Sequence, residues 1–236
     1  MPTAFMPYTS GFCGNEEGSF CENALFLDAR MMTAMAPLFF ALLLWLVRDE
    51  LSDKLMQLKG TDERDSSVTE TLWIITHTGV MSLYWLSEAG LWSTCCALFF
   101  GVFVFRLTLT DQLTGYLPRE MTLSFLMAGL LVAAADGTLS AHAGAALIVW
   151  SCLMTWRLAG YRLTGQETLG MGDVWLGGAL GAWLGLLPAL YTTAVGAGGF
   201  FIWLMLSRRA GGPMGPWLGY SALGAMLLPL YQTVMW

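Results

Sequence analysis

The stretch that decides the fold lies at residues 167–184, where the chain reads Glu167-Thr-Leu-Gly-Met-Gly-Asp-Val-Trp-Leu-Gly-Gly-Ala-Leu-Gly-Ala-Trp-Leu184. Within it, the segment Gly170-Met171-Gly172-Asp173 lies where a polar loop becomes an apolar run that continues past Leu187. We therefore predict a membrane helix with a carboxylate at its N-terminal end. Acidic side chains at bilayer depth are rare and mark transport pathways or catalytic sites. The alternative is that Asp173 is only the N-cap of a helix that begins at glycines.

The composition indicates an integral membrane protein. Of the 236 residues, 56% are hydrophobic and 12% are charged, whereas about 25% of the residues in a soluble domain are charged. The formal net charge is −6, and the acidic residues crowd into the N-terminal tail and the first loop. This charge therefore describes exposed segments, and we predict no nucleic-acid partner.

Apolar runs near the length of a bilayer span recur along the chain. They lie at residues 31–47, 72–86, 91–109, 121–135, 141–156, 174–187, 189–206 and 217–235. The predicted fold class is all-α, a polytopic membrane protein with about eight transmembrane helices. We predict a polar, outward-facing tail at 1–30, then a single helical membrane domain at 31–236 with a charged loop at 49–70.

The basic residues predict the topology, because short cytoplasmic loops retain Lys and Arg. With eight alternating spans, every Lys and Arg except Arg30 falls on one side of the membrane. These residues are Arg48, Lys54, Lys59, Arg64, Arg106, Arg119, Arg157, Arg162, Arg208 and Arg209. The loops at 49–70, 110–120, 157–172 and 207–216 should therefore face the cytoplasm. Asp173 would then lie on the cytoplasmic side.

A second acid, Asp111, ends the third apolar run on that same side. Taken alone, Asp111 could be a simple helix terminator beside a turn. The pair of acids suggests chemistry instead. Two carboxyl groups held close together cannot both ionise easily, so one keeps its proton. The ionised group can then take a proton from water while the protonated one polarises a peptide carbonyl.

At these two acids the chain resembles the type IV prepilin leader peptidases, which are membrane aspartyl proteases of the Gly-x-Gly-Asp type. Asp111 with Leu117 and Pro118 is similar to the family's first catalytic segment, and residues 167–185 are similar to the second. The segment Pro213-Met214-Gly215-Pro216 resembles the Pro-Phe-Gly-Pro that precedes the family's last span. The order and spacing of the spans agree from about residue 72 to the C-terminus.

The resemblance implies an aspartyl endopeptidase of the bacterial inner membrane that cuts the leader from type IV prepilins or pseudopilins at the cytoplasmic face. Asp111 and Asp173 would be the catalytic residues, and membrane lipid would surround the protein. Residues expected to shape the site or bind substrate are Gly170, Met171, Gly172, Pro118 and Glu167, of which Glu167 either tunes the acids or caps the helix. Neither a metal nor a cofactor is expected.

The chain departs from the family pattern in several places. Arg119 stands where the family usually has Asp after Leu-Pro, and Trp175 stands where it usually has Lys two residues after the second Asp. The larger members carry two Cys-x-x-Cys pairs in the first loop, whereas this loop has no cysteine. The family's second activity, N-methylation from S-adenosylmethionine, is linked to the N-terminal region. The resemblance therefore does not extend methylation to this chain.

Other interpretations remain open. The same acids could carry protons or bind a cation in a transporter, and a structural protein of a pilus or secretion machine is a weaker candidate. A protease needs the two carboxyl groups to face one cavity, whereas a transporter distributes polar groups across the membrane. Cys13 and Cys21 could form a disulfide or remain free thiols.

Overall fold

The computed structural model describes residues 35–51, 67–87, 90–165, 167, 169–208 and 211–234. The predicted tail at 1–30, with Cys13 and Cys21, lies outside the described residues, as does most of the loop at 49–70. Within the described part the chain is all-helical, which confirms the predicted fold class. A helix at 35–51 is followed by α2 (Ser67–Leu86), α3 (Leu91–Thr114), α4 (Arg119–Ala135), α5 (Leu139–Thr164), α6 (Met171–Leu184), α7 (Leu186–Ser207) and α8 (Gly215–Val234).

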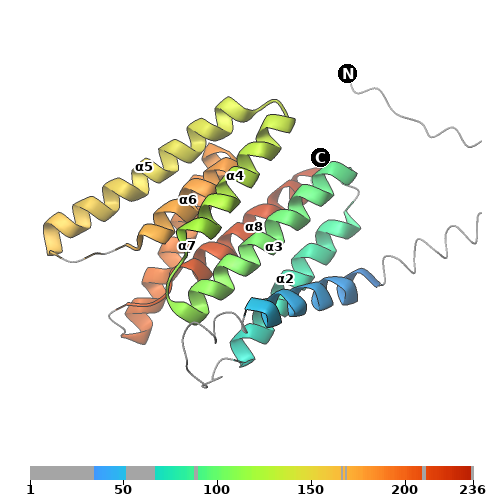
Figure 1. The fold of residues 1–236 in the computed structure, drawn as a ribbon, viewed down its shortest axis with the longest axis horizontal. Coiled ribbons are helices and arrows are strands. Elements are labelled where there is room, and N and C mark those ends of the chain that lie inside the picture. The colour runs from blue at the N-terminus through green and yellow to red at the C-terminus, as the bar shows by residue number, and fades with distance from the viewer. Residues whose placement is uncertain are drawn as a thin grey trace, which may run out of the picture.

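The helices form a bundle in which α6 takes the central position (Figure 1). Its closest packing partners are α4 and α5, and it also contacts α7 and α8. Eight residues of its short apolar sequence are buried, and small residues dominate among them, so that neighbouring backbones approach closely. Gly185, with φ 77°, reverses the chain between α6 and α7. The first turn of α6 is less buried than the rest of the helix, because Met171 is exposed and Gly172 and Asp173 are half-buried.

The connections α3 to α4, α5 to α6 and α7 to α8 lie at the same end of the bundle, at the lower left of Figure 1. Contacts between them agree with this view. The backbone N–H of Gly215, which begins α8, donates a hydrogen bond to Asp111 near the end of α3, and Arg119 at the start of α4 lies over the Trp175 ring of α6. The helix ends that carry the two predicted acids therefore lie at the same end of the bundle (Figure 1), as the predicted alternation of helices requires.

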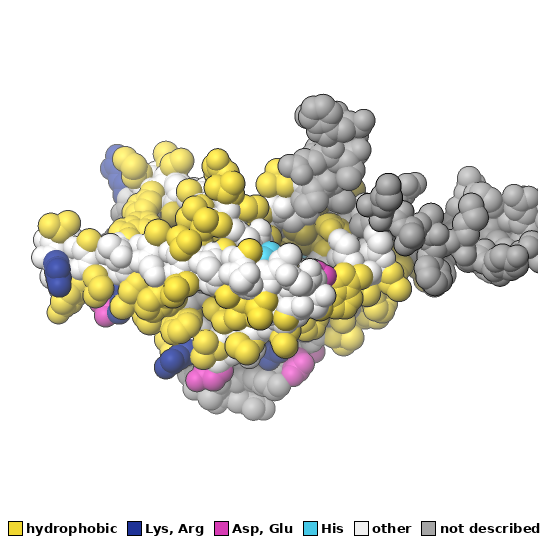
Figure 2. Space-filling model, turned by 90° about the horizontal axis from the view of Figure 1, so that it is seen from above, with side chains coloured by type: hydrophobic (Ala, Val, Ile, Leu, Met, Phe, Trp, Pro, Cys, Tyr) yellow, Lys and Arg dark blue, Asp and Glu magenta, His cyan; other side chains and the backbone are white. Residues whose placement is uncertain are grey.

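The outer surface of the bundle is apolar, as expected for a protein that lies in lipid. Figure 2 shows hydrophobic side chains over most of one face, with charged groups at its margins. Leu163, Met205 and Leu206 have at least four-fifths of their surface exposed, at 86%, 81% and 80%. Apolar surface on this scale is rare on soluble monomers. This protein is a membrane protein.

The predicted number of eight spans is not confirmed. Among the described helices, only α3, α5 and α7 are both long and apolar enough to cross a bilayer by themselves. Helices α4 and α6 have 17 and 14 residues, which reach about 25 and 21 Å at 1.5 Å per residue. The hydrocarbon core is about 30 Å thick. Flanking residues would have to complete these two spans. The number of eight transmembrane spans therefore stays a prediction.

Candidate functional site

Asp111 lies inside α3, one turn before the helix ends, and its side chain is 4% exposed. The helix ends at Gly115, whose φ of 66° allows its N–H to donate to the Asp111 carbonyl oxygen at 2.7 Å. This left-handed glycine is a common helix C-cap. Asp111 is therefore not the helix terminator that its position after an apolar run also suggested. The helix C-cap uses only the backbone of Asp111, so its carboxyl group takes no part in the cap.

The Asp111 carboxyl group is held from α8. The backbone N–H of Gly215 donates to Asp111 Oδ2 at 2.7 Å, across 104 residues of sequence. Gly215 begins α8 and Pro216 follows it. The first N–H groups of a helix have no partner within the helix and attract anions, and Pro216 offers none. The sequence shows only a resemblance at 213–216, and the structure adds Gly215 to the residues around the acid.

Asp173 lies in the first turn of α6, and its two oxygens have different surroundings. Gly170 is the N-cap of this helix, with no side-chain cap, and the Gly170 backbone N–H donates to the Asp173 carboxyl group. A carboxylate three residues after the N-cap often makes this contact. The other oxygen, Oδ1, is buried and has no hydrogen-bond partner among the described residues. The capping interpretation thus accounts for one oxygen only.

The two acids are 62 positions apart in the sequence and belong to α3 and α6. Their carboxyl groups lie close enough for their charges to interact. A buried oxygen without a partner is costly, and its presence beside a second carboxyl group is typical of a site that holds a shared proton, a water molecule or a substrate group.

The segment before α4 packs directly on the first turn of α6. Leu117 is 4% exposed, and Pro118 is the N-cap of α4. A Cβ at Gly172 would lie 2.6 Å from Leu117 Cβ and 2.9 Å from the Leu117 carbonyl oxygen. A Cβ at Gly170 would lie 2.8 Å from Asp173 Oδ2. A Cβ at Gly172 would therefore collide with the protein itself, and one at Gly170 would collide with the Asp173 carboxyl group. The Met171 side chain is 38% exposed, so packing does not restrict this position in the same way.

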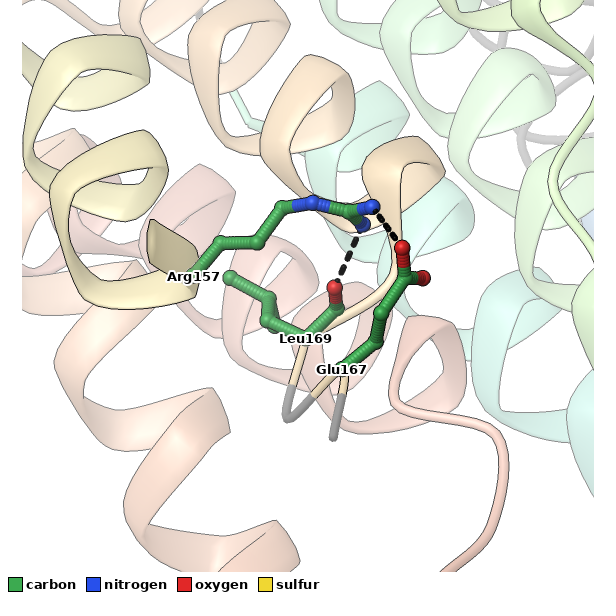
Figure 3. A network of polar contacts seen from close by, with 3 residues as sticks. All are labelled: Arg157, Glu167 and Leu169. Atoms are coloured by element: carbon green, nitrogen blue, oxygen red, sulfur yellow. Dashed lines mark hydrogen bonds and ion pairs between the residues drawn. The ribbon is translucent and has the colours of Figure 1, made fainter. Parts of the chain in front are cut away.

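Glu167 does not cap α6, which corrects one of its two predicted roles. Its carboxylate accepts a hydrogen bond from Arg157 Nη2 of α5 at 2.6 Å (Figure 3). The same guanidinium donates through Nη1 to the Leu169 carbonyl oxygen at 2.7 Å. Arg157 thus holds the loop before Gly170 at two points. Sequence reasoning used Arg157 only for topology, and its spacing to Glu167 gave no signal of this contact.

The two departures from the family pattern contact each other. The Arg119 guanidinium lies over the Trp175 ring, with Cζ 5.4 Å from the ring centroid. A cation–π contact of this kind contributes about 0.5–1 kcal/mol at an exposed position. It connects the start of α4 with the start of α6. Within the described residues, no group of three or more His, Cys, Asp or Glu is placed to hold a metal ion.

A family model described as the type IV leader peptidase family matches residues 98–228. The chain belongs to this family. The matched range contains both Asp111 and Asp173 together with Gly215, and it confirms the family resemblance predicted from the motifs. No solved structure matches the chain.

The chain is also similar to individual family members. It is 37% identical over 160 residues to a prepilin leader peptidase/N-methyltransferase of Pectobacterium carotovorum, covering 62% of this chain and 54% of that protein. A protein of the same name from Dickeya chrysanthemi is 38% identical over 165 residues, covering 64% and 56%. Leader peptidase HopD of Salmonella typhimurium is 35% identical over 143 residues, covering 52% and 86%. The chain thus spans about half the length of the first two relatives.

Proposed function

We propose that this member of the type IV leader peptidase family is an aspartyl endopeptidase that removes the leader of type IV prepilins or pseudopilins. The observation that supports it best is that the charges of Asp111 and Asp173 interact, while one of the two acids has a buried oxygen with no partner among the described residues. Family membership over both acids gives independent support. A substrate helix lying in the membrane would bring its leader to the cytoplasmic surface, where water is available. The transporter alternative has no comparable support.

In the proposed reaction one carboxyl group is ionised and the other protonated. The ionised group takes a proton from a water molecule while the water oxygen attacks the scissile carbonyl carbon. The protonated group donates its proton to the carbonyl oxygen. The tetrahedral intermediate then collapses: the C–N bond breaks, the leaving nitrogen takes a proton from the dyad, and one hydroxyl group of the intermediate returns a proton to the dyad. The products are a leader with a new carboxyl group and a pilin with a new amino group.

The proposal covers the peptidase step and not methylation. The names of the Pectobacterium and Dickeya relatives include an N-methyltransferase, and the aligned part covers about half of each. The HopD protein, named a leader peptidase only, is covered over 86% of its length. The part shared with this chain is therefore linked to the peptidase name in all three.

The experiment that tests the proposal is co-expression of this chain with a candidate prepilin, with leader removal measured by gel shift and by the mass of the product. The expected result is a single cut after a glycine at the boundary between the basic leader and the apolar helix. An unchanged prepilin mass in the presence of membrane-inserted protein, across a panel of prepilins and pseudopilins, contradicts the proposed function.

The proposed orientation in the bacterial inner membrane leads to a separate prediction. A reporter that is active only outside the cytoplasmic membrane should be active when fused near residue 138 and inactive when fused near residues 60, 115, 165 or 210. The physical reason is the retention of Lys and Arg in cytoplasmic loops. Two or more reversals of reporter activity would mean that the number of spans is wrong.

Arg157 should matter more than its partner Glu167. The hydrogen bond from Arg157 to the Leu169 carbonyl carries a charge on the donor, and such bonds contribute about 1.5–3 kcal/mol. The Glu167 side chain is 64% exposed, so its ion pair contributes about 0–1 kcal/mol. We expect Arg157→Met to lower leader cleavage about tenfold and Glu167→Gln to lower it less than about threefold.

The measurement for this pair is cleavage normalised to membrane-inserted protein. Arg162→Met is the matched control, because Arg162 also lies near the end of α5 but makes no hydrogen bond or ion pair with the described residues of this loop. Equal losses in Arg157→Met and Glu167→Gln would mean that the ion pair, and not the backbone contact, orders the loop.

A further inference from the structure

A cavity of about 260 Å³ lies at the end of the bundle opposite the two acids. Residues from the start of α3 and from the ends of α4 and α6 line it, and α2 and α8 complete the wall. Asp111 lies 19 positions after the lining residue Trp92 in the same helix, which corresponds to about 28 Å at 1.5 Å per residue. The cavity is therefore separate from the two acids, and the proposed reaction does not use it.

Aromatic side chains form much of the cavity wall. The rings that line it belong to Tyr84, Trp92, Phe100 and Trp183. Tyr84 and Phe100 are buried, with exposed fractions of 7% and 3%, whereas Trp92 is 56% exposed. Tyr84 and Phe100 thus form the inner part of the wall, and Trp92 lies where the cavity meets the surface.

Two of these rings are held in position by hydrogen bonds. Trp183 Nε1 donates to the Phe125 carbonyl oxygen at 2.8 Å, and its ring stacks on the Phe125 ring with centroids 5.6 Å apart. The Tyr84 hydroxyl group is hydrogen-bonded to Ser93 Oγ at 3.1 Å. The protein itself therefore orders the wall, and most ligand pockets are likewise formed in advance.

Asp136 places a carboxylate at the rim of the cavity. The residue is exposed, and its Oδ1 accepts a hydrogen bond from Trp92 Nε1 at 2.9 Å. Its charge also acts on the Cys96 thiol, which lines the same cavity. An ionised carboxylate has about four acceptor sites on its two oxygens. The hydrogen bond from Trp92 therefore leaves acceptor sites for a ligand.

The Asp136 charge has no cationic partner among the described residues. None of the described lining residues is Lys or Arg, and the ion pairs in this part of the chain do not include Asp136. The connections at this end, residues 87–90, 136–138 and 185, also have no Lys or Arg in their sequence. Asp136 would repel an anionic ligand. A cation with an apolar body suits both the carboxylate and the rings, because ring faces attract cations too.

We propose that this cavity binds an amphiphilic amine, with the ammonium group on the Asp136 carboxylate and the apolar body against the rings. The volume limits the size of that body. A cavity of about 150 Å³ accommodates benzene, and sites for drug-sized ligands begin at about 300 Å³. The 260 Å³ cavity therefore suits an ammonium group that carries one aromatic ring or a short alkyl chain.

Two sources supply this chemistry, a free amine and the ethanolamine headgroup of a membrane lipid. The second source follows from the position of the cavity. Its distance of about 28 Å from Asp111 along α3 is close to the thickness of the hydrocarbon core, about 30 Å. If the acids lie at one surface of the membrane, the cavity lies at the other, where lipid headgroups are found.

The test compares each amine with a neutralised form of itself, on the full chain in detergent. The probes are 2-phenylethylamine, measured by equilibrium dialysis, and phosphatidylethanolamine, measured by native mass spectrometry. Their N-acetyl derivatives keep the carbon body and lose the ammonium charge. We expect the parent chain to bind at least one amine about fivefold or more tightly than its N-acetyl derivative, from an exposed ion pair together with a ring contact. In Asp136→Asn this preference should disappear.

The controls separate poor folding from loss of the site. A ratio of two affinities does not depend on how much of the chain is folded. Asp136→Glu keeps the charge and should retain the preference, as should Glu120→Gln, which removes an exposed acid from the other end of α4. Ala225→Leu adds volume to the cavity wall and should weaken binding of the amine and of its N-acetyl derivative alike.

Each outcome decides the inference. A preference for 2-phenylethylamine alone assigns the cavity to a free amine, one for phosphatidylethanolamine alone assigns it to a lipid headgroup, and a preference in both pairs means that either source can fill it. Equal binding of both amines and their N-acetyl derivatives by the parent chain overturns the inference. A preference that persists in Asp136→Asn overturns it as well. Neither of these two results concerns the peptidase, which is tested by leader cleavage.

Discussion

Asparagine in place of Asp111, or in place of Asp173, should abolish leader cleavage while the protein still accumulates in the membrane. Each acid has a role that the other cannot cover, because one must be ionised and the other protonated for the same step. A positioned acid or base contributes about 10²- to 10⁴-fold to a rate. We expect each single substitution to lower the cleavage rate at least about 10²-fold. The measurement is cleavage normalised to membrane-inserted protein.

Asp136→Asn is the matched control for these two substitutions. Asp136 is also at a helix end, as the C-cap of α4, but its carboxylate accepts a hydrogen bond from Trp92 Nε1 at 2.9 Å and is exposed. Its substitution should leave cleavage almost unchanged. Near-normal cleavage by Asp111→Asn or by Asp173→Asn would remove that residue from the dyad.

The bundle could be predicted because its signals are local. Apolar runs separated by polar loops indicated the order of the helices, and each run described by the structure is helical. The number that spans the membrane was harder to predict, because a run length does not show where a helix ends. The run at 174–187 is divided by Gly185, at which α6 ends and α7 begins one residue later.

The candidate site could be predicted in part. The motifs predict Asp111 and Asp173 as the catalytic pair, and in the structure their charges interact. Whether Asp173 is a cap or a functional acid could not be settled from a tetrapeptide. Its two oxygens answer differently, since one accepts the Gly170 N–H and the other is buried without a partner among the described residues. That division depends on tertiary packing and leaves no trace in sequence spacing.

Contacts between distant segments were the main omission. The Gly215 N–H and the Arg157 guanidinium belong to other helices than the groups they bind. Arg119 and Trp175 were read as two independent departures, yet they form one contact. A single sequence does not show which residues are neighbours in space, so two substitutions that contact each other look like separate departures from the family pattern. In this chain the Arg119–Trp175 contact still connects the starts of α4 and α6.

Replacing Gly172 by a larger residue should have the second large effect on leader cleavage. An added Cβ meets Leu117 at 2.6 Å, and the 2.9 Å approach to the Leu117 carbonyl oxygen involves backbone that cannot swing aside. Overpacking of this kind costs about 1–3 kcal/mol. The first turn of α6 can relieve it only by moving away from the segment Leu117-Pro118, and Asp173 moves with that turn. A misplacement of about 1 Å at a reacting group can cost about a hundredfold in rate.

We therefore expect Gly172→Val to lower leader cleavage about a hundredfold, with Gly170→Ala also sensitive because its Cβ would lie 2.8 Å from Asp173 Oδ2. Met171→Leu is the matched control in the same turn, since it conserves volume at a 38% exposed position. The Cβ added by Gly177→Ala clashes with the end of the flexible Leu153 side chain and also contacts Val149, so this substitution should cost stability before it costs chemistry. The measurement is cleavage normalised to membrane-inserted protein, with thermal stability followed in parallel. Parent-like cleavage by Gly172→Val would mean that the packing of Leu117 on α6 does not position Asp173.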